Sequence, residues 1–227
     1  MKGKNKSKKS NDVQNEAINK DSPLIQLPPS EILKPLKSIC KIDNSNELAT
    51  GFLIKFFKGE KDFFCLMTNE HVITKELIKQ RKKISIYYDS ESQLKEIALN
   101  PEERYIKEFT DDIDVDATVV EILPKDEISK DYFLLPLLEY MNKFDNLINN
   151  EITIIQYPLG GQLSYANGKI KEINGNEFTH IASTQKGSSG SPVFLKDSIK
   201  VIGIHKSRIE NNSKKYGDFI GPIFNLF

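Results

Sequence analysis

The chain has 227 residues, and its 38% hydrophobic content is enough to build a real core. Its 32 basic and 32 acidic residues sum to a net charge of zero, so no overall field favours a nucleic acid or an anionic membrane as partner. No stretch approaches the roughly 18 consecutive apolar residues that a membrane-spanning helix needs. We therefore expect a globular protein that binds neither nucleic acid nor membrane.

The first 22 residues differ in composition from the rest. The first ten, MKGKNKSKKS, hold five lysines and no acidic residue, which leaves 27 basic against 32 acidic residues in the remainder. Aliphatic residues are too few here to offset the chain entropy lost on folding, so we predict a disordered basic tail at 1–22 and a folded domain at 23–227. The basic start lacks the apolar segment of a secretory signal, which predicts a cytoplasmic location.

After the tail, short apolar runs rich in Ile, Val, Phe and Tyr alternate with turn signals. This spacing is typical of an antiparallel β-barrel or sandwich rather than a βαβ fold. The runs are SICKI (38–42), GFLIKFF (51–57), DFFCLMT (62–68), KISIYY (83–88), ATVVEIL (117–123), EITIIQY (151–157), VIGIH (201–205) and FIGPIF (219–224). We expect few helices, with the best candidates at 74–82 and 130–147.

The chain holds two cysteines and three histidines. Cys40 and Cys65 lie in apolar surroundings without CxxC spacing, so buried free thiols explain them better than a disulfide or a metal site. The histidines, at 71, 180 and 205, are too few and too scattered for a zinc centre. We predict that the protein needs neither a metal nor a cofactor.

The stretch KGSSGSPVF (186–194) contains the best candidate for a reactive serine. A serine hydroxyl is a weak nucleophile unless a base removes its proton and donors stabilise the oxyanion that forms. Glycines permit the sharp bend that turns backbone N–H groups toward one point, and Ser189 lies between Gly187 and Gly190. We expect the N–H groups of Gly187 and Ser189 to form an oxyanion hole. Taken alone, the stretch is explained equally well by an ordinary Gly/Ser turn.

Two further segments hold the partners that such a serine needs. In CLMTNEHVI, His71 directly follows a buried run. In DDIDVDATVV, aspartates that include Asp114 and Asp116 precede an alternating run. A histidine base, held by a carboxylate, is the arrangement that activates a serine for acyl transfer.

The segments TNEHV, DATVV and GSSGSP occur in the order of the histidine, aspartate and serine motifs of the trypsin-like (chymotrypsin-fold) serine proteases, and they resemble those motifs. The resemblance implies a catalytic triad of His71, Asp116 and Ser189. Asp116 is preferred because only this aspartate is followed by a small residue and then β-branched residues in the family's register. Asp114 is the alternative.

The resemblance covers roughly residues 36–226, because TGFL also resembles the strand that precedes the histidine motif. It implies an all-β fold of two six-stranded antiparallel β-barrels, at about 36–125 and 150–227, with the active site in the cleft between them. Ser188 stands where digestive trypsins carry an aspartate that pairs with a new N-terminus, so activation by that ion pair is not expected. The chain looks nearer to the bacterial-type and viral branches.

Two residues near the serine stretch point to a specificity pocket. Thr184 precedes Ser189 by five residues, and His205 lies in VIGIH. A hydroxyl and an imidazole can both donate hydrogen bonds to a carboxylate or a carboxamide. The pair resembles the pocket of the glutamyl endopeptidases (V8-type), which implies cleavage after Glu, with Gln as the second choice. His180 is expected to be structural or exposed.

These features predict a serine endopeptidase whose partner is a polypeptide substrate. A regulatory protein partner is a further expectation, because uncontrolled cleavage inside a cell would be harmful. The alternative is a catalytically silent domain of the same fold that binds a peptide or a protein, since a sequence does not reveal whether the catalytic groups are assembled.

Overall fold

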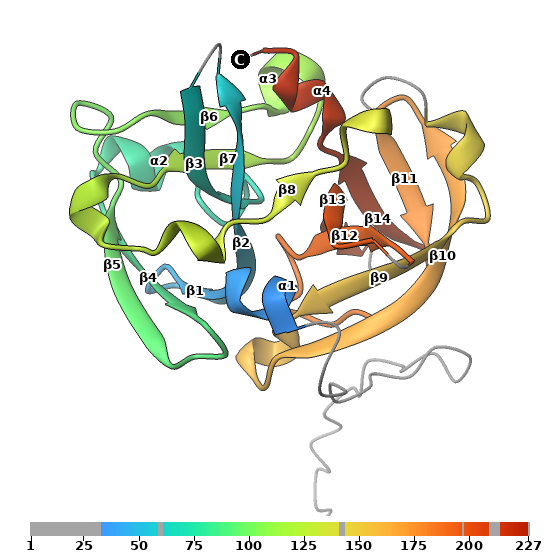
Figure 1. The fold of residues 1–227 in the computed structure, drawn as a ribbon, viewed down its shortest axis with the longest axis horizontal. Coiled ribbons are helices and arrows are strands. Elements are labelled where there is room, and N and C mark those ends of the chain that lie inside the picture. Colours follow the sequence, from blue (N-terminus) through green and yellow to red (C-terminus); the bar gives the residue numbers. More distant parts are fainter. Residues whose placement is uncertain (1–32, 59–60, 141–143, 197, 209–213, 227) are drawn as a thin grey trace, which may run out of the picture.

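The computed structural model describes residues 33–58, 61–140, 144–196, 198–208 and 214–226 (Figure 1). Strands of this part form two sheets, one N-terminal and one C-terminal in sequence, which are antiparallel except for β8 in the second, and the helices are short. The predicted tail at 1–22 lies outside the described residues. No helix within them has the length and apolarity to cross a lipid bilayer.

The first sheet has seven strands in the order β5-β4-β1-β2-β3-β7-β6. Seven of the predicted apolar runs form strands of the two sheets, because most of their apolar side chains are buried in a core. The strands of the first sheet are β1 Ile39–Asp43, β2 Leu48–Lys58, β3 Lys61–Thr68, β4 Lys83–Tyr88, β5 Gln93–Ala98, β6 Ile106–Glu108 and β7 Thr118–Glu121.

The second sheet follows the order β12-β9-β10-β11-β14-β13-β8, and an additional pairing of β12 with β13 closes six of these strands into a barrel. Its strands are β8 Leu135–Pro136, β9 Glu151–Gln156, β10 Ser164–Asn174, β11 Glu177–His180, β12 Pro192–Leu195, β13 Lys200–Arg208 and β14 Lys215–Phe219. The predicted all-β, two-barrel fold class is confirmed. The first unit differs in detail: it is a curled seven-stranded sheet with β5 and β6 at its edges.

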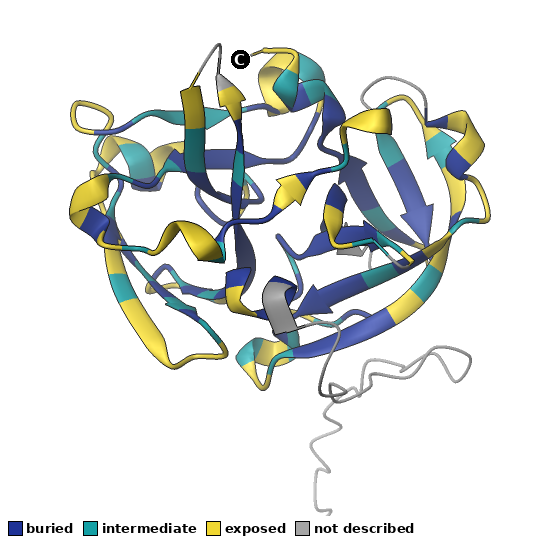
Figure 2. Ribbon diagram, viewed as in Figure 1, coloured by how far each residue is buried: buried dark blue, intermediate teal, exposed yellow. Residues whose placement is uncertain are grey.

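Apolar side chains hold the two units together. Each unit has its own cluster of buried residues, and a third cluster joins Phe52 and Ile54 of β2 to Phe194 of β12 and Ile204 of β13. Figure 2 shows most of β2 and β9 buried, whereas much of β5 is exposed. Full burial of one such side chain stabilises the fold by about 1.5–3 kcal/mol, so this shared cluster fixes the two units relative to each other.

Helices are few, as predicted. The predicted helix at 74–82 is present as the shorter α2 Lys75–Lys79, which begins at the N-cap Thr74, whose side chain accepts a hydrogen bond from the N–H of Leu77. The other helices are α1 Leu33–Ser38, α3 Thr110–Ile113 and α4 Gly221–Phe224, with 3₁₀ turns at Pro124–Asp126, Lys130–Tyr132, Leu138–Tyr140, Asp145–Leu147 and Pro158–Gly160. The predicted run at 219–224 is mostly α4, because Pro222 suits the first turn of a helix.

The predicted helix at 130–147 is wrong. Pro136 lies inside this segment, where it removes a helical N–H donor and disfavours the α conformation of Leu135. The chain is instead extended from Phe133 to Leu137. Leu134 exchanges backbone hydrogen bonds with Leu53 and Lys55 of β2, both at 2.9 Å, and β8 runs parallel to the start of β13. The segment therefore crosses from one sheet to the other, as β8 in Figure 1 shows.

Candidate active site

Strand pairing brings His71 and Asp116 together. Strands β3 and β7 are antiparallel with Thr68 opposite Thr118, so the residues just after β3 lie beside those just before β7. The Nδ1 atom of His71 is 2.6 Å from the Oδ2 atom of Asp116. Asp114, the alternative, is exposed at the left-handed end of α3. The geometry therefore favours Asp116 as the carboxylate that faces His71.

The backbone around His71 also binds this carboxylate. The Oδ1 atom of Asp116 accepts the N–H of Glu70 at 2.8 Å and that of His71 at 3.3 Å, and the side chain of Asn69 donates to the Asp116 carbonyl at 2.7 Å. Burial alone would raise the pKa of Asp116, but the hydrogen bonds and the charge of His71 outweigh it and hold the pKa below its ordinary value. Asp116 is therefore ionised at neutral pH.

The stretch that contains Ser189 is a tight loop between β11 and β12. The N–H of Ser188 donates to the carbonyl of Gln185, and the hydroxyl of Ser191 donates to the carbonyl of Ser188. Gly187 and Gly190 have φ angles of 88° and 84°, which residues with a Cβ rarely adopt. Among the described residues, no hydrogen-bond acceptor engages the N–H of Gly187 or of Ser189. These two donors remain available to a developing oxyanion.

A single threonine of the first sheet holds this loop. The hydroxyl of Thr50, on β2, donates to the carbonyl of Gly187 at 2.7 Å and accepts the N–H of Tyr157 at 3.0 Å. The N–H of Thr50 donates to the carbonyl of Ser189 at 2.9 Å. The carbonyl of Thr50 accepts the hydroxyl of Thr68, which lies three residues before His71. Thr50 thus links the serine loop to the segment that carries His71.

The two predicted pocket residues flank the same loop. Thr184 precedes it and is buried. His205, on β13, donates its N–H to the carbonyl of Ser191 and accepts the N–H of Gly190, at 2.8 and 2.9 Å. No hydrogen bond joins the side chains of Thr184 and His205 in the described part of the chain. Both therefore lie against the serine loop without binding each other.

The imidazole of His205 is paired with a second buried histidine. Its Nδ1 atom is 3.1 Å from the Nε2 atom of His180, on β11. Burial lowers the pKa of His205 to about 3 and that of His180 well below its ordinary value, so both rings are neutral. The positive charge of Lys215, whose ammonium donates to the carbonyl of Ala182, lowers both pKa values further.

Most residues of this site lie in a region that matches a known protein family. The sequence profile of the trypsin-like peptidase domain matches residues 49–204, which include His71, Asp116 and Ser189. The chain belongs to the trypsin-like peptidase domain family. A segment of 82 residues is 40% identical to the glutamyl endopeptidase of Staphylococcus epidermidis, but this segment is 34% of the chain and 29% of that relative. The match therefore spans less than a third of the relative's length.

Solved structures share the fold of this trypsin-like domain at low sequence identity. The structure of a Glu endopeptidase in complex with MPD has a TM-score of 0.62 and 18% identity, and the match covers 92% of the chain and 96% of that protein. The serine endoprotease from Yersinia pestis has a TM-score of 0.62 and 15% identity over 88% of the chain and 66% of that protein. Deg5 has a TM-score of 0.61 and 16% identity, covering 86% and 88%.

Sequence reasoning missed three residues of this trypsin-like site. His180 was expected to be structural or exposed; it is buried, and its pairing with His205 was not foreseen. The hydroxyl of Thr50 gave no signal, because its contacts lie more than a hundred residues away in sequence. Asp218 is fully buried and accepts the N–H of Asp116 at 2.7 Å. Only the rule that charged residues avoid the inside of a strand could have drawn attention to Asp218.

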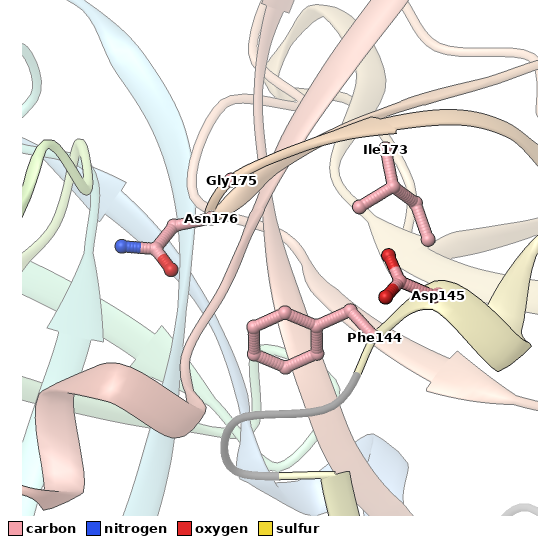
Figure 3. Close-up of a pocket in the computed structure, with 5 residues that line it drawn as sticks. All are labelled: Phe144, Asp145, Ile173, Gly175 and Asn176. Atoms are coloured by element: carbon pink, nitrogen blue, oxygen red, sulfur yellow. The ribbon is translucent and has the colours of Figure 1, made fainter.

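A shallow cavity of about 310 Å³ lies elsewhere on the second barrel (Figure 3). Phe144 and Asp145 line one side, and Ile173, Gly175 and Asn176 of the β10–β11 hairpin line the other. None of these five residues belongs to the predicted triad or pocket. We assign no role to this cavity.

Proposed function

We propose that this trypsin-like domain is a serine endopeptidase that hydrolyses polypeptides through an acyl-enzyme on Ser189. The observation that carries the proposal is the 2.6 Å contact between His71 and the ionised Asp116, on the segment that Thr50 links to the Ser189 loop. A carboxylate at Nδ1 keeps the proton on that nitrogen, which leaves Nε2 as an acceptor for a serine proton.

The reaction follows from these groups. As Oγ of Ser189 bonds to the substrate carbonyl carbon, its proton passes to Nε2 of His71, and Asp116 stabilises the resulting imidazolium. The proton then passes to the leaving amine as the C–N bond breaks, which leaves the acyl group on Ser189. In the second half-reaction His71 takes a proton from water as the water oxygen bonds to the acyl carbon. The ester bond to Oγ of Ser189 then breaks, the acid product leaves, and the proton passes from His71 to Oγ.

The oxyanion formed in each half-reaction would bind the N–H groups of Gly187 and Ser189. In the described part of the chain neither donor is used internally, and the positive φ of Gly187 sets the direction of its peptide. A Cβ at position 187 would lie 2.8 Å from the carbonyl oxygen of Tyr157, so only glycine fits there without a shift. Such preorganised donors typically account for about 10²–10³ in kcat each.

We further propose that the enzyme cleaves after Glu, with His205 and Thr184 as the groups that bind the acidic side chain. The burial of both residues against the serine loop supports this proposal. The buried ammonium of Lys215 adds positive charge behind the His180–His205 pair, which favours a carboxylate over a carboxamide. The Staphylococcus epidermidis relative is a glutamyl endopeptidase, which agrees with this proposal, and the match covers 29% of that protein.

The first experiment maps cleavage sites in a denatured proteome digest by mass spectrometry, for the wild type and for Ser189→Ala. We expect cuts with the wild type alone, clustered after Glu. Cuts that persist with Ser189→Ala would refute the acyl-enzyme proposal. No cuts with either protein would favour a domain that binds peptides without cleaving them.

A second experiment tests the pocket with fluorogenic peptides that differ only in Glu, Gln or Leu at the cleaved position. We expect His205→Ala to lower kcat/KM for Glu and Gln but to leave Leu nearly unchanged. Lys215→Met should lower the Glu to Gln ratio specifically. Ratios equal to those of the wild type in both variants would discard the pocket while leaving the catalytic mechanism intact.

A further inference from the structure

Asp218 is a buried carboxylate that contacts the loop of the proposed catalytic acid from the opposite barrel. It lies on β14, is fully buried, and its Oδ2 atom accepts the N–H of Asp116 at 2.7 Å. The ammonium of Lys206, on β13, is 3.6 Å from the same oxygen. The Oδ1 atom of Asp218 is buried and has no hydrogen-bond partner among the described residues.

Burying the Asp218 carboxylate inside the barrel lowers the stability of the fold. A buried carboxylate loses its hydration, and a half-satisfied one loses more than its single ion pair returns. A neutral or apolar side chain at position 218 would avoid this loss. The one short hydrogen bond that the Asp218 side chain makes within the described residues is to the N–H of Asp116, 102 positions away in sequence.

The segment that carries Asp116 is bound by the backbone and side chain of residues near His71 and, in addition, by the second barrel. It consists of the single turn α3, whose N-cap Phe109 makes no side-chain capping bond, followed by the left-handed residue Asp114. Two side chains of the second barrel bind it: Asn176 donates to the carbonyl of Ile113 at 2.9 Å, and Asp218 accepts from Asp116. Of these two side chains, Asp218 binds Asp116, the residue that faces His71.

We propose that Asp218 is a positioning residue: by accepting the N–H of Asp116 across the interface between the barrels, it holds the Asp116 carboxylate in line with His71. This inference rests on the proposed peptidase function, because it assigns Asp218 to the same site. Within the described ranges, no hydrogen bond joins Asp218 to His71 or Ser189, so its effect passes through the backbone of Asp116.

The charges around Asp218 are consistent with an ionised carboxylate at neutral pH. Lys206 faces it from β13, Glu177 from β11, and Asp116 from the first sheet. Burial raises the pKa of Asp218 to about 6, while Lys206 and the N–H of Asp116 oppose this rise. Above about pH 6 the stronger, charged acceptor is therefore present.

The test compares variants that keep or remove the acceptor. Asp218→Asn retains an oxygen that can accept the Asp116 N–H, whereas Asp218→Leu has a similar shape and no acceptor. At about pH 8, we expect Asp218→Leu to lower kcat by about 10- to 100-fold with little change in KM, because small misplacements of catalytic groups have effects of this size. Asp218→Asn should recover most of the lost kcat. Asp218→Ala replaces Asp218→Leu if the latter does not fold.

A spectroscopic measurement makes the inference independent of turnover. The Nδ1 proton of His71, held in a short hydrogen bond to Asp116, should give a low-field proton resonance in the wild type. We expect this resonance to weaken or move in Asp218→Leu and to persist in Asp218→Asn. If the wild type shows the resonance but hydrolyses no peptide, the proposed function fails, while the positioning role is still decided by the resonances of the variants.

Asp126→Ala is the matched control, because it also removes a buried, ion-paired carboxylate, here the partner of Arg104 in the first sheet. It should lower the stability of the fold but leave kcat and the His71 resonance as in the wild type. The inference is overturned if Asp218→Leu keeps both wild-type kcat and the resonance. It is also overturned if folded Asp218→Asn is as impaired as Asp218→Leu, since the acceptor would then be irrelevant.

Discussion

The hydroxyl of Thr50 offers a sharp test of how the serine loop is held. Thr50→Val keeps the shape of the side chain but removes the donor to the Gly187 carbonyl and the acceptor of the Tyr157 N–H. Thr50 and Tyr157 are fully buried, and Gly187 is buried as well. Each buried backbone group left without a partner costs about 1–3 kcal/mol, so we expect the free energy of unfolding to fall by about 2–6 kcal/mol.

The same substitution should slow the reaction. A loosened carbonyl at Gly187 lets the adjoining peptides turn, and the N–H of Gly187 is one of the two proposed oxyanion donors. Complete loss of one such donor lowers kcat by about 10²–10³, so partial loss predicts a fall of at least about tenfold with KM little changed. The assays are urea unfolding and steady-state kinetics on a fluorogenic peptide.

Thr179→Val is the control for this prediction. The hydroxyl of Thr179 is buried and has no hydrogen-bond partner in the part of the chain that the structure describes, so its removal should leave stability unchanged or slightly raised. If Thr50→Val matches the wild type in both stability and kcat, its two hydrogen bonds do not hold the loop and the reasoning is refuted.

Three further predictions concern the loop, the core and pH. Gly190→Ala should lower kcat/KM by at least about tenfold, because a Cβ there would lie 2.0 Å from the Thr50 carbonyl oxygen at a φ of 84°. Arg104→Ala should lower the free energy of unfolding in urea by about 3–5 kcal/mol, because it leaves Asp126 buried and unpaired. The raised pKa of Asp218 should make the fold more stable below about pH 4 than above about pH 6, by on the order of 3 kcal/mol; urea titrations at several pH values should show this fall in the wild type but not in Asp218→Asn.

Each of these three predictions would be contradicted by a specific result. Wild-type kinetics in Gly190→Ala would mean that the loop tolerates a Cβ beside Thr50. A double variant of Arg104 and Asp126 as unstable as the sum of the single variants would mean that the two side chains do not interact. Identical pH dependence of stability in the wild type and Asp218→Asn would mean that Asp218 does not titrate near pH 6 in the folded protein.

Local patterns were sufficient to predict the strands around the site. The runs that became β2, β3, β7 and β9 have enough consecutive β-branched and aromatic residues to specify a buried strand without help from distant residues. The helix at 130–147 failed although its leucines recur at helical spacing, because Pro136 interrupts it and Leu134 pairs with β2 instead. Partners in the two sheets decide the conformation of that segment, and a local pattern does not contain them.

At the site, too, local sequence indicates some residues, and distant contacts determine others. His71 and Asp116 could be proposed from the sequence because each lies beside an apolar run, in the segments TNEHV and DATVV that resemble the family's motifs. The links from Thr50 to Gly187 and from Asp218 to Asp116 join residues more than a hundred positions apart, through polar groups that a single sequence does not distinguish from ordinary ones. Packing of one barrel on the other creates these links.

The extended stretch from Phe133 to Leu137 has a consequence for how the molecule unfolds. Within it, Leu134 is hydrogen-bonded to β2, and Leu137 donates to Val201 of β13, so one short piece of chain belongs to the hydrogen-bond ladders of both sheets. Detaching either sheet from this stretch leaves backbone groups of β2 or of β13 without their hydrogen-bond partners. We therefore expect the two halves to melt in one cooperative transition, with no populated species in which one barrel is folded and the other is not.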